Sequence, residues 1–252
     1  MNPPIDRLRT IVAKLRAPDG CPWDREQTHE SLKPHLLEEC YELIDAIDAR
    51  DDKELKEELG DLLLQVVLHS QMAAEERRFT LDDVAEIISN KLVNRHPHVF
   101  GENRLPDSES VVRQWDQIKR VEKQERKSAL DGVPKALPAL ARAQKVQSKA
   151  SRIGFDWNTA EEAFAKVHEE IMEVASASDE ALAEEVGDLL FAIVNFTRKK
   201  RLDAEQLLNR ATAKFSERFQ SIEQLAQERG LDFSSLSLSE MDALWDEVKN
   251  ST

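Results

Sequence analysis

The chain has 252 residues, of which 40% are hydrophobic and 33% are charged, with 35 Lys and Arg against 49 Asp and Glu. Its 7 glycines, 9 prolines and 6% aromatic residues are too few for a β-sandwich, a β-barrel or a Gly-rich nucleotide loop. The net charge of -14 has the wrong sign for attraction to a nucleic-acid backbone, so we expect no nucleic-acid partner. The abundance of Leu, Ala, Glu, Gln, Lys and Arg predicts an all-α protein.

The sequence carries no signal for a membrane or for export. It contains no run of about 18 apolar residues, and its first residues lack the basic and apolar regions of a signal peptide. The two cysteines, Cys21 and Cys40, have no C-x-x-C spacing, which favours a reducing compartment over a disulfide framework. We therefore expect a cytoplasmic protein with no membrane partner.

Apolar residues recur at helical spacing along most of the chain and predict about ten helices. Thr80, Thr159 and Ser237 are each followed three residues later by Asp or Glu, which is the spacing of a capping box at a helix start. The last proline is Pro138. The second half is therefore expected to consist of uninterrupted helical hairpins.

The two halves of the chain repeat the same series of motifs in the same order, with offsets between 123 and 131 residues. The paired motifs are Glu38-Glu39-x-x-Glu42 with Glu169-Glu170-x-x-Glu173, Glu57-Glu58-Leu59-Gly60-Asp61 with Glu184-Glu185-Val186-Gly187-Asp188, Lys91-x-x-x-Arg95 with Lys214-x-x-x-Arg218, and Trp115-Asp116-x-x-Lys119 with Trp245-Asp246-x-x-Lys249. A stretch with Gly132, Pro134 and Pro138 separates them. We predict two tandem helical repeats, residues 1–127 and 139–252, joined by a linker at 128–138.

The acidic motifs predict a cation site in each half. One E-E-x-x-E frame arises about twice by chance in a chain this acidic and by itself indicates only a solvated glutamate face. Here each copy is followed one helix later by E-x-x-D. Acids three residues apart share a helical face, so a short antiparallel hairpin directs four carboxylates toward one point. Oxygen ligands without Cys or His favour Mg²⁺, with Mn²⁺ as a substitute. The two sets are Glu39, Glu42, Glu58 and Asp61 in the first half, and Glu170, Glu173, Glu185 and Asp188 in the second.

Several residues near these acids are expected to have structural roles. Gly60 and Gly187, inside predicted helices, cost about 1 kcal/mol each relative to alanine, and their recurrence indicates close helix approach beside the site. The neighbouring apolar residues are expected in the core: Leu62, Leu63, Leu189 and Leu190. We interpret Trp23 and Trp157, which follow loop glycines, as core anchors or loop locks.

A basic pair adds a second chemical requirement. Lys214 and Arg218 lie one helical turn apart and present an ammonium and a guanidinium on one face, which suits two phosphoryl groups of a polyphosphate. The alternative is ordinary surface solvation. Trp245 has two interpretations as well, because it is placed either to stack on a base or to pack in the core.

These residues together resemble the MazG family of tandem-domain bacterial nucleoside triphosphate pyrophosphohydrolases, over essentially the whole chain. Besides the acidic motifs and Trp245, three strings carry the resemblance: Gly20-Cys21-Pro22-Trp23-Asp24, Arg95-His96-Pro97-His98-Val99-Phe100 and Gly154-Phe155-Asp156-Trp157. The resemblance implies that each repeat forms a four-helix-bundle-like module with the same repeat of a second subunit. It therefore implies a homodimer.

The resemblance also implies an enzyme that uses Mg²⁺ to hydrolyse nucleoside and deoxynucleoside triphosphates to the monophosphate and pyrophosphate. Nucleotide-pool housecleaning is the implied role. The catalytic metal ligands would be Glu170, Glu173, Glu185 and Asp188. Phosphate contacts are implied for Lys166, Lys214 and Arg218, and a place near the base is implied for Trp245.

Two differences between the halves favour the second as the catalytic one. Lys166 stands three residues before its E-E-x-x-E motif, where the first half has His35. Asn195, able to hydrogen-bond a sugar or base, stands seven residues after Asp188, where the first half has Leu68. The first-half acids would then bind metal without turnover or carry a weaker activity. The shorter spacing between the acidic motifs of the second half, 11 residues against 15, leaves the contacts of its loop open.

Two other classes of protein compete with this interpretation. A carboxylate-bridged di-iron bundle requires Glu-x-x-His on two helices, and only Glu26-x-x-His29 fits. A non-catalytic helical regulator or scaffold, which binds a partner protein through its amphipathic helices, would show neither nucleotide turnover nor metal dependence. A regulatory protein partner is also compatible with the enzyme.

Overall fold

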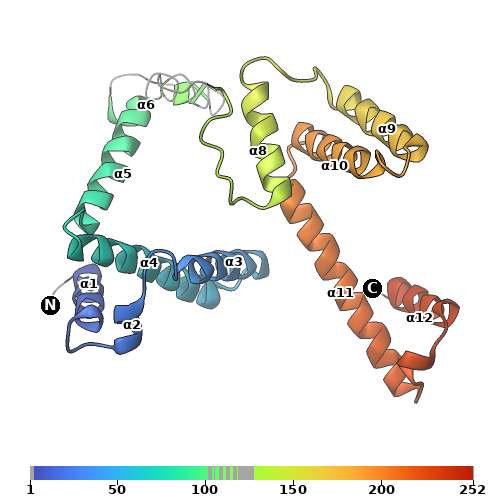
Figure 1. Cartoon of the computed structure of the whole chain (residues 1–252), viewed down its shortest axis with the longest axis horizontal. Coiled ribbons are helices and arrows are strands. Elements are labelled where there is room, and N and C mark those ends of the chain that lie inside the picture. Colours follow the sequence, from blue (N-terminus) through green and yellow to red (C-terminus); the bar gives the residue numbers. More distant parts are fainter. Residues whose placement is uncertain are drawn as a thin grey trace. The chain divides into compact units, whose positions relative to one another are not determined.

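The structure, a computed structural model, describes residues 3–101, 104, 106–107, 110–111, 114–115, 118 and 128–251 (Figure 1). In these residues all regular structure is helical, with eleven α-helices, one short 3-10 helix and no strand. The predicted all-α class is therefore confirmed. No helix in the described ranges is long and apolar enough to cross a bilayer.

The chain divides into two compact units, Met1–Gln124 and Glu125–Thr252. The first contains α1 (Pro4–Arg16), α2 (Pro22–Glu26), α3 (Lys33–Ala49), α4 (Asp52–Glu75), α5 (Leu81–Arg95) and α6 (Pro97–Phe100). The second contains α8 (Ala139–Ser151), α9 (Ala160–Ser176), α10 (Leu182–Lys199), α11 (Ala204–Glu228), the 3-10 helix η1 (Phe233–Ser235) and α12 (Leu238–Ser251). Residues 128–138 form turns and no helix. The repeat and linker bounds given above stay a prediction.

The helices begin where local capping signals place them. Thr80 and Asp83 form a reciprocal capping box at the start of α5. The Thr159 hydroxyl accepts a hydrogen bond from the Glu162 backbone at 3.2 Å. The carboxylate of Glu240 accepts one from the Ser237 backbone at 2.8 Å. These contacts satisfy amide groups that the first turn of a helix leaves free, and they confirm all three predicted starts.

In the first unit, α3 and α4 form an antiparallel hairpin, and α1 packs against α4. The tight turn passes through Arg50, whose φ of 56° is left-handed, and Asp51 caps α4. The core between α1 and the hairpin consists of Val12, Leu32, Val67, Leu68 and Met72. This core fixes the position of the hairpin that carries the acids.

In the second unit, α9 and α10 form the equivalent hairpin, and α8 packs against α10. The buried Gln147 side chain on α8 donates to the carbonyl of Phe191 on α10 at 2.8 Å. The start of α11 is tied to α8, because the Gln144 amide oxygen accepts a hydrogen bond from the Ala204 backbone at 2.9 Å. The far end of α11 packs on α12 around Ile222, Ala226 and Leu244.

Both acidic hairpins leave apolar side chains uncovered. Leu63 is 41% exposed and Leu190 is 51% exposed, so the prediction that they are core residues is wrong within a single chain. Other apolar side chains of the two hairpins are also exposed: Leu37, Tyr41, Ile44, Ile47, Leu59, Phe164, Ile171, Met172 and Val186. Large apolar side chains exposed in such number on each hairpin are typical of an interaction surface.

Candidate functional site

The α9–α10 hairpin brings three of its four predicted metal ligands together. Glu170, Glu173 and Glu185 each offer a carboxylate oxygen, and these oxygens all lie within 4.8 Å of one another. The turn between the helices places the last turns of α9 beside the first turn of α10, which is why residues far apart in sequence meet. Asp188 is exposed, one turn further along α10, and lies outside this group.

The most informative of these acids is Glu170, which is only 5% exposed. Its Oε1 lies 2.8 Å from Nζ of Lys166. Its Oε2 is buried and has no hydrogen-bond partner among the described residues. A buried carboxylate oxygen without a partner is costly, and a cation in the group would remove that cost.

The charges around Glu170 also favour a cation in this acidic group. A contact with the neighbouring Glu170 carboxyl, followed by burial, raises the pKa of Glu173. Hydrogen bonds to Glu169 and then to Glu170 raise the pKa of Lys166 above its usual value. Lys166 therefore stays protonated at neutral pH. Crowded carboxylates beside a fixed ammonium can hold a divalent cation and an anionic ligand together.

The first unit contains a similar group, formed by Glu39 on α3 with Glu58 and Asp61 on α4, within the same 4.8 Å limit. Burial, followed by repulsion from neighbouring carboxylates, raises the pKa of Glu39 and of Glu58. Glu42 lies outside this group. The ring of His35 lies 3.4 Å from Glu38, so this cluster has no equivalent of the ion pair between Lys166 and Glu170.

Asn195 lies further along α10 and lines a cavity of about 480 Å³. The aromatic walls are Phe155, Trp157 and Phe191. The Asn195 side-chain oxygen accepts hydrogen bonds from the Arg198 guanidinium, at 2.7 Å from Nη2. The Oε1 of Gln147, also in the wall, is buried without a partner in the described ranges. The size and lining fit a small planar ligand with polar edges.

The loop carrying Trp157 is fastened to the end of α10. Asp156 pairs with Arg198 and, at 3.3 Å, with Lys199, whose Nζ also donates to the Trp157 carbonyl at 2.7 Å. Burial opposes ionisation of Asp156, but these two cations outweigh it and lower the pKa of that carboxyl.

The two loop tryptophans are more exposed than the sequence predicted. Trp157 is 42% exposed and Trp23 is 56% exposed, so their interpretation as core anchors is wrong. Sequence reasoning therefore missed Phe155 and Trp157 as cavity walls. The available signal was the Gly154-Phe155-Asp156-Trp157 string.

The basic pair and the last tryptophan lie on α11 and α12. Lys214 is exposed and Arg218 half-buried, and neither forms an ion pair with a carboxylate of the described residues. Trp245 packs on the α11–α12 core, with its ring centroid 5.2 Å from that of Phe215. Trp245 is half-buried against this core, and its place near a base stays a prediction. No described contact joins these three residues to the acidic group. In the first half, Asp116 and Lys119 lie outside the described residues.

The two mid-helix glycines do not mark close helix packing within the chain. A Cβ built at Gly60 or at Gly187 has no heavy atom within 4 Å in the structure as described. The prediction of close approach is therefore wrong for each unit taken alone.

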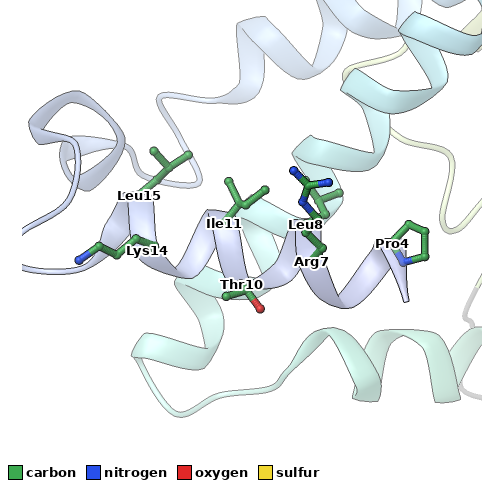
Figure 2. A pocket seen from close by; sticks show the side chains of 7 residues that line it. All are labelled: Pro4, Arg7, Leu8, Thr10, Ile11, Lys14 and Leu15. Atoms are coloured by element: carbon green, nitrogen blue, oxygen red, sulfur yellow. The ribbon is translucent and has the colours of Figure 1, made fainter. Parts of the chain in front are cut away.

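A larger hollow of about 860 Å³ lies along α1. Figure 2 shows its lining, in which Leu8, Ile11 and Leu15 alternate with Arg7 and Lys14 on one helix. None of the described residues that line it carries a carboxylate. Volume alone therefore does not identify the site, and the acidic hairpins remain the candidates.

Comparison with known proteins gives an independent result. The model of the MazG nucleotide pyrophosphohydrolase domain matches residues 27–100 and 158–222, which include both acidic hairpins. A Thermotoga maritima protein named nucleoside triphosphate pyrophosphohydrolase/pyrophosphatase MazG is 48% identical over 248 residues, covering 97% of this chain and 95% of the relative.

Two further relatives are similar over nearly the whole of this chain. The nucleoside triphosphate pyrophosphohydrolase of Escherichia coli K12 is 46% identical over 254 residues, 97% of each chain. The Bacillus subtilis protein YabN is 47% identical over 248 residues, which cover 96% of this chain and 51% of YabN. With two matched domain segments and relatives similar over nearly the full length, this chain belongs to the MazG nucleotide pyrophosphohydrolase family.

Proposed function

We propose that the chain hydrolyses nucleoside and deoxynucleoside triphosphates between the α- and β-phosphates, giving the monophosphate and pyrophosphate, and that the α9–α10 hairpin carries the reaction. The observation that carries this proposal is the ion pair of Lys166 with the buried Glu170, whose unpartnered Oε2 lies in the group with Glu173 and Glu185. The Oε2 of Glu58 in the first unit is also buried without a partner, so the lysine is what distinguishes the second hairpin. The names of the relatives support the same reaction.

The donor set of this group fits a hard divalent cation. Glu170, Glu173, Glu185 and Asp188 would hold Mg²⁺, or Mn²⁺ in its place, because all the donors are carboxylate oxygens and Glu170 lacks a partner for one of them. When bound, such an ion lowers the pKa of a water and neutralises phosphate charge.

The other side chains have distinct roles in this proposal. Lys166, held protonated beside Glu170, turns to an α- or β-phosphate when the carboxylates are neutralised. A carboxylate of the group that does not bind the ion would accept the proton of the attacking water. Asn195 contacts the sugar or base from the cavity wall. Lys214 and Arg218 contact phosphates, and the place of Trp245 near the base stays a prediction.

The proposal also covers the oligomeric state, the first acidic group and the cellular role. The exposed apolar faces of both hairpins support a homodimer in which each repeat pairs with its copy. Glu39, Glu42, Glu58 and Asp61 would bind a second metal ion with little or no turnover. Housecleaning of the nucleotide pool in the cytoplasm is the proposed role, and a regulatory protein partner is compatible with it.

Product analysis tests this function. The purified protein is incubated with a panel of ribo- and deoxyribonucleoside triphosphates, with Mg²⁺ or with a chelator, and products are separated by ion-exchange chromatography. We expect monophosphate and pyrophosphate, both abolished by the chelator. Diphosphate with orthophosphate would refute the cleavage position. Absence of turnover on every substrate would favour a regulatory or scaffold protein.

A further inference from the structure

The amide of Asn195 has a fixed orientation in the wall of the cavity beside α10. Its side-chain oxygen accepts two hydrogen bonds from Arg198, at 3.1 Å from Nε and 2.7 Å from Nη2. A guanidinium can only donate, so the amide oxygen must face Arg198 and the amide nitrogen must face away from it. Among the described residues this nitrogen has no hydrogen-bond partner. Asn195 is therefore a hydrogen-bond donor toward a ligand in the cavity.

Arg198 is itself held in place from its other side. Its two terminal nitrogens pair with the carboxylate of Asp156, with Nη1 lying 3.3 Å from Oδ2. The Arg198 side chain is only 13% exposed. A planar guanidinium that is bound on both sides has little freedom to turn. The chain of contacts from Asp156 through Arg198 thus fixes the side chain of Asn195.

Gln147 supplies the opposite kind of group in the same wall. The residue is 6% exposed, and its Nε2 donates to the backbone carbonyl of Phe191 at 2.8 Å. A carbonyl can only accept, so the amide oxygen of Gln147 points elsewhere. This Oε1 is buried and has no partner in the part of the chain that the structure describes. Leaving such an acceptor unpaired is costly, and an N–H group of a ligand would remove that cost.

The walls of the cavity suit a flat ring between these two amides. Phe155, Trp157 and Phe191 contribute aromatic faces, and Phe155 is 82% exposed, so its ring is available for stacking. Nucleobases stack on such faces and are read along their Watson–Crick edge. That edge has an acceptor next to an N–H group in adenine, guanine, hypoxanthine, cytosine and uracil alike. One donor and one acceptor from the protein complement every one of these edges.

The cavity also lies at a suitable place relative to the acids. Asn195 follows Asp188 by seven residues, which is two helical turns on the same face of α10 and roughly 10 Å along its axis. A nucleotide laid along this face places its phosphates toward the acidic group and its base toward the cavity.

We infer that Asn195 and Gln147 recognise the Watson–Crick edge of the base. The Asn195 nitrogen donates to the acceptor of that edge, Oε1 of Gln147 accepts from the adjacent N–H group, and Arg198 is the positioning residue for Asn195. The inference rests on the proposed function and names its substrate class. Bases that keep an acceptor beside an N–H group, deaminated ones included, are substrates. Bases that have lost this N–H group are discriminated against.

A substrate that lacks the N–H group tests the role of Gln147. We expect kcat/KM for ATP to exceed that for purine riboside triphosphate, which has no amino group, by about ten-fold in the wild type. In Gln147→Leu the ratio should fall to near one. Because both substrates meet the same enzyme, a folding defect of the variant does not change the ratio. A wild-type ratio near one, or an unchanged ratio in the variant, would overturn the inference.

An analogue modified elsewhere serves as the matched control. 7-Deaza-ATP keeps the Watson–Crick edge of ATP, and its kcat/KM should equal that of ATP within about two-fold. A loss as large as that of purine riboside triphosphate would place recognition on another edge of the base and would contradict the inference.

A double-mutant cycle tests the positioning role of Arg198. Arg198→Lys keeps a charge for Asp156 but loses the planar pair of donors to Asn195, so KM for ATP should rise about five-fold with kcat nearly unchanged. The same substitution in an Asn195→Ala background should have no further effect on KM. Lys199→Gln, which removes the other ion pair of Asp156, should have the same effect in both backgrounds. Additive losses for Arg198→Lys and Asn195→Ala would refute the positioning role.

Binding of a monophosphate separates this inference from the proposed reaction. Isothermal titration calorimetry with Mg²⁺ compares AMP with purine riboside monophosphate on the full chain. We expect the Kd for AMP to be about ten-fold lower in the wild type and about equal in Gln147→Leu. This result without triphosphate hydrolysis would refute the proposed function alone. Equal or absent binding of the two ligands by a wild type that hydrolyses triphosphates would refute the edge recognition alone.

Discussion

The two halves of the chain present the same acidic hairpin in different surroundings. In the second unit, the group includes the buried Glu170, paired with Lys166. In the first unit, its counterpart Glu39 is less buried, and His35, in the position of Lys166, contacts Glu38 instead. The comparison teaches that duplication has preserved the group of carboxylates in both halves, whereas a lysine paired with the central glutamate is found in the second group only, among the described residues.

The space beside the two hairpins differs as well. Leu68 on α4 is buried in the core between α1 and α4, together with Val12 of α1. Asn195, at the same position of α10, lines an open cavity, because α8 packs there through Gln147 and leaves room between the aromatic walls. One helix position therefore supports folding in the first unit and is available to a ligand in the second.

Removal of an equivalent metal ligand from each half gives the largest expected contrast. Glu185→Ala should lower kcat for triphosphate hydrolysis by about 1,000-fold, since several kcal/mol of charge stabilisation are lost. The matched Glu58→Ala should leave kcat within about two-fold. Steady-state kinetics with pyrophosphate detection checks both. Equal losses in the two variants would show that the halves share the chemistry.

Replacement of Lys166, which lies beside the acidic group of the second unit, tests whether its exchange for His35 in the first unit matters. Lys166→Ala should lower kcat/KM by roughly 30-fold, because a charge-assisted contact to phosphate contributes about 2 kcal/mol. His35→Ala should change it little. The measurement is kcat/KM at saturating Mg²⁺ for both variants. A Lys166→Ala enzyme with unchanged kcat/KM would remove this lysine from the site.

The Leu68 and Asn195 pair separates folding from ligand contact. Asn195→Ala should reduce kcat/KM by about five- to ten-fold through loss of one hydrogen bond, with a small effect on unfolding. Leu68→Ala should leave kcat/KM nearly unchanged but destabilise the first unit by about 2–5 kcal/mol, because it opens a cavity in the core. Urea unfolding and kinetics on both variants test the contrast. The reverse pattern would contradict the assignment of the two units.

The smallest effect is expected for the ion pairs of Asp156. Its folded pKa is lowered by Arg198 and Lys199, so the stability that it contributes is present above the unfolded pKa of an aspartate and is lost as pH falls through the folded value. Asp156→Asn should therefore destabilise the second unit by about 1 kcal/mol at pH 7. Thermal unfolding from pH 7 down to about pH 2 should show that the difference between variant and wild type shrinks below the unfolded pKa of an aspartate and then vanishes. A constant difference across this range would rule out the ion pairs as its cause.

Local signals explain how much of the fold was predictable. The capping residues Thr80, Thr159 and Ser237 act within one helical turn, so their effect is readable from sequence spacing alone. The meeting of Glu170 with Glu185 was also predictable, because a short loop forces two consecutive amphipathic helices into a hairpin. Exposure was not. Leu190 and Trp157 are apolar residues that the pattern assigned to a core, and the pattern does not state which chain provides that core.

The sequence by itself determined the helical class, the duplication and the carboxylate pairs, because helix formation, capping and i, i+3 spacing depend on residues close together in the chain. Only the tertiary structure decided that Glu170 is buried with one oxygen unpartnered, and that Leu68 is core while Asn195 faces a cavity. These properties depend on how α1, α8 and α11 pack against the two hairpins. Packing of that kind joins residues distant in sequence, and no local pattern records it.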